Sequence, residues 1–446
     1  MAKLNLSALK NKFFLVLFNN GFISVVGILT SSLLFHVLSI DEAGIWFFVQ
    51  MFVAFCEAAR WGFLSTATVA FYAGAEPKRA ATVLGSVWFL ALVLTAVILS
   101  INAAAYLLIH TSDVETQLCV KWVGITFLSS LPADVIFWRL QADQKYKAML
   151  WYRLLNSLST IVAFIILILL HKFTLENALL YNFLTNSLSS LVGIFLNMAG
   201  LKTIMNRSRA CIMELVHYGK YTLGTTSFSV MLGNADTLII NFVLGTSAVA
   251  VYNLASKLLP IVELPLRSFI TIGMSEMATS FNHKNMHQVT YIFKKYSGML
   301  TWAFIPLIIG SLLFSDIAIN LFGGAKYHDS IAPNLFRAFM LVAILFPIDR
   351  FNGVALDIIH KTKTNFYKVI IMLVVKVAAN FAGIAIFGNL YGIAFSLFLV
   401  TVSAIMYGNY QLRKYLDYTI PGILITGFVE MKAFIRENVN YKSKGG

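Results

Sequence analysis

The sequence predicts an all-α polytopic membrane protein, with twelve transmembrane helices in two six-helix bundles and with both termini in the cytoplasm. Hydrophobic residues make up 59% of the 446 residues and charged residues only 12%, whereas about a quarter of the residues of a soluble protein are charged. The apolar residues form runs long enough to cross a bilayer, which takes about 20 residues. Basic residues gather between alternate runs, as in the cytoplasmic loops of membrane proteins.

The apolar runs predict helices rather than membrane-spanning strands, because they are far longer than about ten residues and do not alternate with polar positions. The first run follows Lys3, Lys10 and Lys12 and lacks a convincing cleavage site, so we interpret it as a retained helix. The twelve predicted spans are residues 12–36, 43–72, 82–109, 118–140, 149–170, 174–200, 217–241, 247–275, 295–320, 333–359, 366–387 and 390–411.

The positions of the basic residues test this count. If the N-terminus lies inside, 25 of the 34 Lys and Arg residues fall in the inner connections or near the inner ends of spans, three fall in the outer connections or near the outer ends, and the other six are assigned to the spans themselves. A missed span would move every later basic cluster to the other side of the membrane. The excess of Lys and Arg on the inner side therefore supports twelve helices. The formal net charge of +14 is spread over short clusters and forms no single patch, so nucleic acid is not expected as a partner.

A long basic connection near the middle of the chain predicts two lobes. The predicted parts are an N-terminal six-helix lobe at 1–201, a cytoplasmic linker at 202–217, a C-terminal six-helix lobe at 218–411 and a cytoplasmic tail at 412–446. A shift of 206 residues aligns the second span of each half and places Glu57 on Glu263. Six helices per half give a parallel repeat, and transporters built this way hold their substrate between the lobes.

Charged residues within the spans predict a hydrated cavity, because a charge at the membrane centre costs at least about 2.5–3.5 kcal/mol and normally faces water or a partner. On a continuous helix, Lys257, Pro260, Glu263 and Arg267 fall within an arc of about 120°, and Pro260 and Pro265 could bend or open this helix. The candidate substrate-binding residues are Arg60, Lys257, Arg267, Arg350 and Lys376. The candidate coupling or polar cavity residues are Glu57, Asp236, Glu263 and Asp349.

A purely structural role for some of these charges stays open. Three acid–base pairs could neutralise each other locally and hold helices together. These pairs are Glu57/Arg60, Glu263/Arg267 and Asp349/Arg350. Lys257 and Lys376 have no acidic neighbour on their own helix, which favours a cavity role. Asp236 could be protonated, pair with a base or help to coordinate a coupling cation.

Once the three local pairs are set aside, Lys257 and Lys376 remain against Asp236, so basic residues slightly outnumber acidic ones within the spans. This excess favours an anionic substrate. A phosphate-bearing one is favoured because Arg can bind phosphate bidentately while its acidic partner orients it. No HExxH, GxSxG or P-loop motif occurs, so the sequence predicts a transporter rather than an enzyme, with no metal and no cofactor. Without an ATP site, the energy would come from an ion gradient, with H+ and Na+ both open, from the substrate gradient or from a partner.

The stretch NADTLIINFVLGTSAVAVYNLASKL, residues 234–258, places an Asp before a Leu-Gly turn, followed by an aromatic residue and Ala-x-Lys. This pattern, with the twelve-helix topology, resembles the polysaccharide-transporter family of the multidrug/oligosaccharidyl-lipid/polysaccharide (MOP) flippase superfamily, and within it the Wzx-type O-antigen flippases. The resemblance implies a MATE-like fold in the bacterial inner membrane. The lipid II flippase branch typically has fourteen helices, which the predicted count disfavours.

The resemblance implies a flippase that moves undecaprenyl-diphosphate-linked oligosaccharide, the O-antigen repeat unit, from the cytoplasmic to the periplasmic leaflet by alternating access. In this family cationic cavity residues engage the diphosphate, and the partners implied are the lipid bilayer, an O-antigen polymerase and a chain-length regulator. A multidrug/cation antiporter of the same superfamily stays open, although the lone bases count against it. A membrane O-unit polymerase or ligase is disfavoured by the short outer loops.

Overall fold

The computed structural model describes residues 22, 25–109 and 111–443, and within these ranges nearly every residue lies in a helix and none in a strand. Contacts divide the chain into two units, which we describe one at a time. Unit 1 extends to Asn241 and includes Gly245–Ala250, whereas unit 2 comprises Phe242–Leu244 and the chain from Val251 onward. The predicted all-α fold is confirmed.

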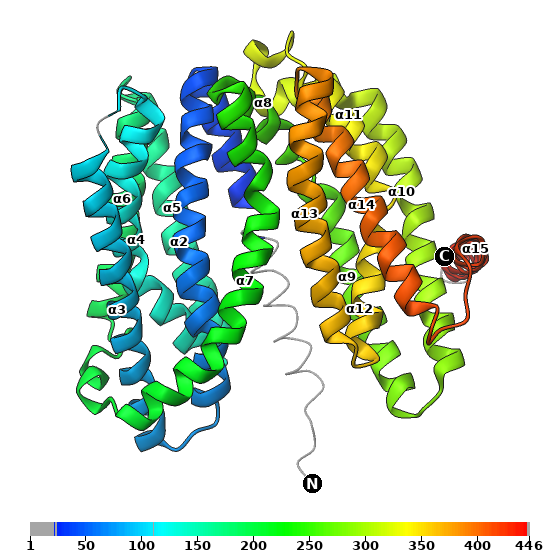
Figure 1. Cartoon of the computed structure of the whole chain (residues 1–446), viewed down its shortest axis with the longest axis horizontal. Helices are drawn as coiled ribbons and strands as arrows, with labels where there is room; N and C mark the ends of the chain where they lie inside the picture. The colour runs from blue at the N-terminus through cyan, green and yellow to red at the C-terminus, as the bar shows by residue number, and fades with distance from the viewer. Residues whose placement is uncertain (1–21, 23–24, 110, 444–446) are drawn as a thin grey trace. The chain divides into compact units, whose positions relative to one another are not determined.

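Unit 1 consists of long helices that begin at residues typical of helix N-termini. Its helices are a short apolar helix at Val25–Val37, α2 (Ile40–Tyr72), α3 (Pro77–Leu108), α4 (Val114–Ala142), α5 (Tyr146–Leu169), α6 (Leu175–Phe195), the 3-10 helix η1 (Leu201–Asn206) and α7 (Arg209–Leu244) (Figure 1). Ser39 caps α2 in a capping box with Glu42. The side chains of Thr174 and Ser208 accept backbone hydrogen bonds in the first turns of α6 and α7.

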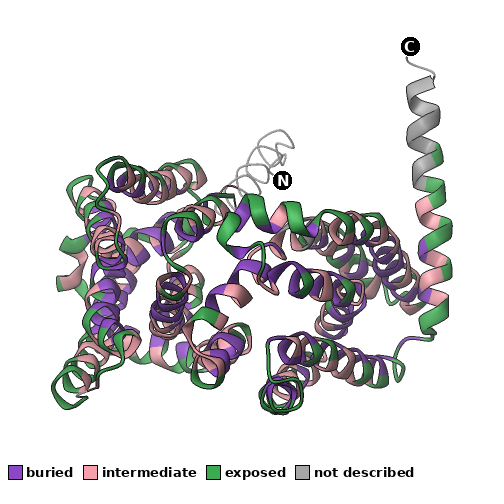
Figure 2. Ribbon diagram, turned by 90° about the horizontal axis from the view of Figure 1, so that it is seen from above, coloured by how far each residue is buried: buried purple, intermediate pink, exposed green. Residues whose placement is uncertain are grey.

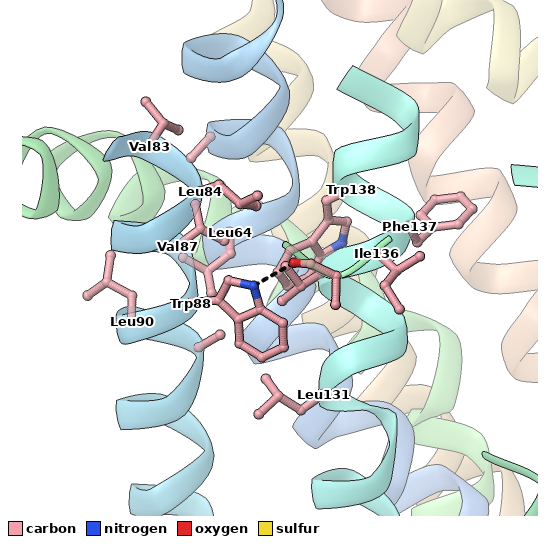
Figure 3. Packing of buried hydrophobic residues seen from close by; sticks show 14 of the residues in the cluster. Leu64, Val83, Leu84, Val87, Trp88, Leu90, Leu131, Ile136, Phe137 and Trp138 are labelled. Atoms are coloured by element: carbon pink, nitrogen blue, oxygen red, sulfur yellow. Dashed lines mark hydrogen bonds between the residues drawn. The ribbon is translucent and has the colours of Figure 1, made fainter. Parts of the chain in front are cut away.

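The apolar core of unit 1 gathers between α2, α3 and α4. Trp88 and Trp138 are buried there together with Leu64. The indole Nε1 of Trp88 donates to the carbonyl oxygen of Ala199 at 2.9 Å, so the tryptophan also ties α3 to the segment before η1 (Figure 3). Burying an aromatic side chain while its N–H is satisfied retains the hydrophobic gain without the cost of an unpaired donor.

Unit 2 takes up the rest of the chain. Its helices are α8 (Thr246–Ser256), whose first turn belongs to unit 1, α9 (Pro260–Asn282), α10 (Met286–Gly323), the 3-10 helix η2 (Ala325–Tyr327), α11 (Ala332–Ala343), α12 (Phe346–Ile358), α13 (Thr362–Phe387), α14 (Tyr391–Leu412) and α15 (Ile420–Ser443). α13 and α14 form an antiparallel hairpin and lie side by side in Figure 1.

The helices agree with the predicted spans over most of the chain. Among the described residues, nine helices are long and apolar enough to cross a membrane, and α11 with α12, bent by 46°, make a tenth candidate. The chain is therefore a multi-pass membrane protein. The predicted span 247–275 is broken into α8 and α9, and the first predicted span, 12–36, lies largely outside the described residues. The count of twelve and the cytoplasmic ends stay predictions.

The two units divide the chain differently from the boundaries that the sequence suggests. α7, expected to open the C-terminal lobe at residue 218, is grouped with unit 1. Its backbone approaches α2 closely, because a Cβ on Gly62 would lie 3.2 Å from the Cα of Leu223. The rings of Phe71 and Tyr218 also meet edge to face at 5.6 Å. The expected linker, 202–217, is helical for most of its length, in η1 and the start of α7.

The segment expected to be a cytoplasmic tail, residues 412–446, contains helix α15. Figure 1 shows α15 end-on, whereas α13 and α14 are seen along their length from top to bottom. In Figure 2, which is turned by 90°, α15 is seen along its length. α15 therefore runs roughly perpendicular to the spans of unit 2. It crosses α10 at Gly298 and Gly427, where any added Cβ would overlap the backbone of the other helix. Trp302 of α10 donates to the carbonyl oxygen of Leu424 at 2.9 Å.

Candidate functional site

The carboxylate of Glu263 joins two arginines in unit 2. Oε2 of Glu263 lies 3.0 Å from Nη2 of Arg267, one turn further along α9, and Oε1 lies 3.8 Å from Nη2 of Arg350 on α12. The exposed fractions of the two arginine side chains are 68% and 52%, whereas that of Glu263 is 27%. We refer to these three residues as the Glu263 cluster. Sequence spacing predicted the Glu263/Arg267 contact, but not the contact with Arg350.

A break in the predicted eighth span positions this cluster. The chain leaves α8 after Ser256, turns at residues 257–259 and resumes as α9 with Pro260 in its first turn. Proline is favoured at this position because its missing N–H would be unpaired there anyway. Glu263 then lies in the first turn of α9, where the helix dipole stabilises a carboxylate. Arg350 lies near the start of α12, just after the bend between α11 and α12.

The charges of the Glu263 cluster do not cancel. One carboxylate faces two guanidinium groups, so the cluster carries a formal charge of +1. Each arginine meets a different oxygen of Glu263, so the carboxylate holds the two guanidinium groups near each other, and both side chains stay exposed enough to meet another ligand. Two neighbouring and exposed guanidinium groups suit bidentate binding of phosphate oxygens.

The two lysines predicted to line a cavity lie at other positions of unit 2. Lys257 is half-buried in the turn between α8 and α9, so it does not continue the helical face of Glu263 and Arg267 that a continuous helix would give. Lys376 is buried on α13, with 9% of the residue exposed. The structure therefore brings Arg267, Arg350 and Glu263 together among the predicted residues of unit 2, and a role for the lysines stays a prediction.

Asp349 is buried in an ion pair that the sequence did not predict. Its Oδ1 lies 2.5 Å from Nζ of Lys368 on α13, and the same ammonium donates to the Asp349 carbonyl oxygen at 2.8 Å. Their side chains are only 7% and 5% exposed. The local Asp349/Arg350 pair considered from the sequence is wrong, because Arg350 turns to Glu263 instead. Lys368, counted as a loop charge, belongs to the helix core, and no sequence signal distinguished it.

Arg60 is fully buried in unit 1 and uses its guanidinium to join three helices. Its Nε and Nη2 lie 2.8 and 2.5 Å from Oδ2 of Asp134 on α4. Nη1 donates to the carbonyl oxygen of Phe127 at 2.9 Å and to Oγ1 of Thr95 on α3 at 3.3 Å, and Nη2 donates to Oγ of Ser130 at 2.6 Å. We call these residues the Arg60 network.

The Arg60 network replaces the local Glu57/Arg60 pair that the sequence left open. The carboxylate partner of Arg60 is Asp134, whose other oxygen accepts from Nε1 of Trp61 at 2.9 Å. The guanidinium also stacks on the Phe127 ring, 4.0 Å from its centroid. With no exposed surface, Arg60 could reach a substrate only if this network opened. The structure thus gives the arginine a helix-joining role, and its predicted contact with substrate stays untested.

Glu57 and Asp236 complete the predicted acidic residues. Glu57 lies one turn before Arg60 on α2 and is partly exposed, and Asp236 is buried on α7 with 6% exposed. Among the described residues, no group of three His, Cys, Asp or Glu side chains is placed to hold a metal ion. The choice of coupling ion and the expected absence of a cofactor stay predictions.

Solved structures of MOP transporters have a similar fold. An inward-facing multidrug resistance MATE family transporter gives a TM-score of 0.72 at 14% identity, over 88% of this chain and 95% of that chain. The lipid II flippase MurJ, in an inward closed conformation, gives 0.69 at 16% identity, over 95% and 92%. A MOP superfamily transporter from Pyrococcus furiosus gives 0.60 at 14% identity, over 91% and 95%. At these identities the likeness shows the fold.

These comparisons confirm the expected MOP fold, and the neighbours are named as transporters and a flippase rather than as enzymes. None of the curated proteins matches the sequence. The model of a family described as "Polysaccharide biosynthesis protein" matches residues 33–332, about two thirds of the chain. The chain therefore belongs to the polysaccharide biosynthesis protein family and has the fold of the MOP superfamily.

Proposed function

We propose that this protein flips a lipid-linked oligosaccharide, carried on undecaprenyl diphosphate, from the cytoplasmic to the periplasmic leaflet of the bacterial inner membrane. The membership in a polysaccharide biosynthesis family supports the substrate class. The Glu263 cluster is the structural observation that supports a phosphate-bearing substrate. It presents two exposed guanidinium groups next to each other in a multi-pass membrane protein. The O-antigen repeat unit is the oligosaccharide that we propose.

The chemistry of the cluster fits a diphosphate better than a cationic drug. A cationic substrate would meet two guanidinium groups and a single, already paired carboxylate, which is electrostatically unfavourable. A diphosphate can accept from both arginines at once, and its negative charge balances the charge that Glu263 leaves uncompensated. The residues Arg267 and Arg350 would hold the diphosphate, while Glu263 would keep them oriented.

Reconstitution in liposomes tests this proposal. Fluorescent undecaprenyl-diphosphate-linked oligosaccharide is placed in one leaflet, and a membrane-impermeant quencher reports its transfer to the other. We expect Arg267→Ala and Arg350→Ala each to lower the transfer rate by about tenfold or more, because each removes a charge-assisted contact of about 1.5–3 kcal/mol. Arg267→Lys should retain part of the rate, because it keeps the charge but loses the bidentate geometry.

Arg337 supplies the matched control. It also pairs with a carboxylate in unit 2, Asp316, and its side chain is 30% exposed. Arg337→Ala should transfer the lipid at close to the wild-type rate. Wild-type transfer by both Arg267→Ala and Arg350→Ala would refute the role of the cluster. Export of a cationic dye without lipid transfer would instead establish the antiporter alternative.

The energy source and the protein partners follow from the same proposal. We propose that an H+ or Na+ gradient drives the cycle, with Asp236 and Glu57 as the buried and partly buried carboxylates able to respond to it. Imposing each gradient separately across the liposomes identifies the ion by the rate that it accelerates. An O-antigen polymerase and a chain-length regulator are the partners that would receive the flipped repeat units.

A further inference from the structure

A pocket of about 540 Å³ lies where α14 ends and α15 begins. Its lining includes the apolar Met406 and Ile420, the ring of Tyr410, and the basic residues Arg413 and Lys414. Met406 and Tyr410 are strongly exposed, at 67% and 66%, on a helix that is otherwise suited to crossing the membrane. The pocket therefore combines an exposed apolar wall with two cations, and none of its described lining residues is acidic.

The two basic side chains of this pocket differ in the contacts that they already make within the protein. Nζ of Lys414 donates to Oε1 of Gln411 at 2.9 Å and lies 4.4 Å from the centroid of the Tyr410 ring. The exposed Arg413 guanidinium makes no hydrogen bond or ion pair with the side chains that the structure describes. An Arg that has no partner among the described side chains, beside a Lys and an aromatic ring, is suited to binding an anionic group.

Hydrogen bonds hold two of the residues that line the pocket, Asn409 and Tyr418. Tyr418, which is 4% exposed, donates to Oδ1 of Asn409 at 2.8 Å, and the same oxygen accepts from Asn352 on α12 at 3.3 Å. Burial raises the pKa of Tyr418, which keeps its hydroxyl protonated as a donor. These bonds fix the short connection between α14 and α15, so the position of Arg413 relative to both helices is defined.

The level of the pocket in the membrane follows from α10 and α15. α15 crosses α10 at Gly298, and the remaining 25 residues of α10, up to Gly323, extend about 38 Å at 1.5 Å per residue. This length matches a hydrocarbon core of about 30 Å with part of one interface. The exposed residues Ile425, Phe428 and Val429 lie on α15, which runs perpendicular to the spans (Figure 2). A helix perpendicular to the spans and with exposed apolar residues has the orientation of an interfacial helix, which lies along one membrane surface.

We infer that the pocket between α14 and α15 binds the phosphate of a membrane lipid. Arg413 and Lys414 hold the phosphate oxygens at the headgroup level, and the lipid chains follow Met406 and Tyr410 along α14 toward the membrane interior. With the orientation that the basic loops predict, this lipid belongs to the cytoplasmic leaflet. Basic residues beside an interfacial helix favour anionic lipids. The site is separate from the Glu263 cluster, and it does not depend on the proposed flippase activity.

Native mass spectrometry of the purified full-length chain tests this inference. Dioleoyl-phosphatidylglycerol and undecaprenyl monophosphate are titrated separately, because both offer a phosphate on an apolar chain. We expect Arg413→Ala/Lys414→Ala to weaken binding of at least one of these probes by about tenfold or more, because two charge-assisted contacts are lost. Loss with phosphatidylglycerol assigns the site to a bulk phospholipid, and loss with undecaprenyl phosphate alone assigns it to a polyprenyl carrier.

Lys202→Ala/Arg209→Ala is the matched control, because it also removes one exposed Lys and one exposed Arg from the predicted cytoplasmic side. Its lipid affinities should stay within about twofold of those of the wild type. Wild-type binding of both probes by the Arg413/Lys414 double variant would overturn the inference, and so would an equal loss in the control. If the double variant cannot be purified, Arg413→Gln alone should lower the affinity, and unchanged affinity would again overturn the inference.

Discussion

Replacing Arg60 with Leu should destabilise the protein strongly. The substitution leaves the carboxylate of Asp134 buried, at 7% exposure, with the indole of Trp61 as its remaining donor in the Arg60 network. Breaking a buried pair by removing one partner costs about 3–5 kcal/mol, because an uncompensated charge remains. The other acceptors lose less. Thr95 keeps its bond to the Ala91 carbonyl oxygen, and Ser130 keeps its bond to the carbonyl oxygen of Phe127. We therefore expect a loss of about 4 kcal/mol in the free energy of unfolding.

A double-mutant cycle separates the ion pair from the packing. Asp134→Leu alone should cost a similar amount, because it leaves the guanidinium of Arg60 buried without its carboxylate. The double variant Arg60→Leu/Asp134→Leu should be more stable than the sum of the two losses predicts, by about 3 kcal/mol, because no charge remains buried. Unfolding by a denaturing detergent in mixed micelles gives the free energies. A loss below about 1 kcal/mol for Arg60→Leu, or strict additivity, would refute the reasoning.

Two further predictions concern unit 2. Lys368→Met should lower the free energy of unfolding by about 3–5 kcal/mol, because Asp349 would keep a buried charge without its partner. Unfolding in mixed micelles measures this loss. The double variant Lys368→Met/Asp349→Leu leaves no buried charge and should recover much of the loss. Gly427→Leu should detach α15 from α10, because the leucine side chain would overlap the backbone at Gly298. Trp302 packs against α15, so its fluorescence emission should shift to the red when α15 leaves. An unchanged emission spectrum would contradict the contact.

The course of the helices through the membrane could be predicted from the sequence because hydropathy is a local property. Runs of apolar residues located nearly every helix, and Pro260 correctly marked a place where a helix opens. α15 was missed because its apolar first part is interrupted by Glu430 and Lys432 and is followed by a polar second part. This composition suits an interfacial helix as well as a tail, and only packing against α10 distinguishes the two.

The partners of the charges could not be predicted, because helical periodicity shows only the neighbours within one helix. Helical spacing therefore offered Glu57 as a possible local partner of Arg60, whereas the structure pairs Arg60 with Asp134, 74 residues away. Lys368 likewise finds Asp349 on another helix. The contact between Glu263 and Arg267 was predictable, since i,i+4 residues share a face. Charges that join different helices depend on tertiary packing, which a single sequence does not reveal.

The guanidinium of Arg60, which joins α2, α3 and α4, has a practical consequence for measuring motion in this protein. Spin labels attached to the outer surfaces of these three helices should keep constant mutual separations when other parts of the protein move, since sliding any of the three would strip Arg60 of its acceptors. Such label pairs provide an internal reference of zero displacement, against which movements elsewhere in the molecule can be calibrated.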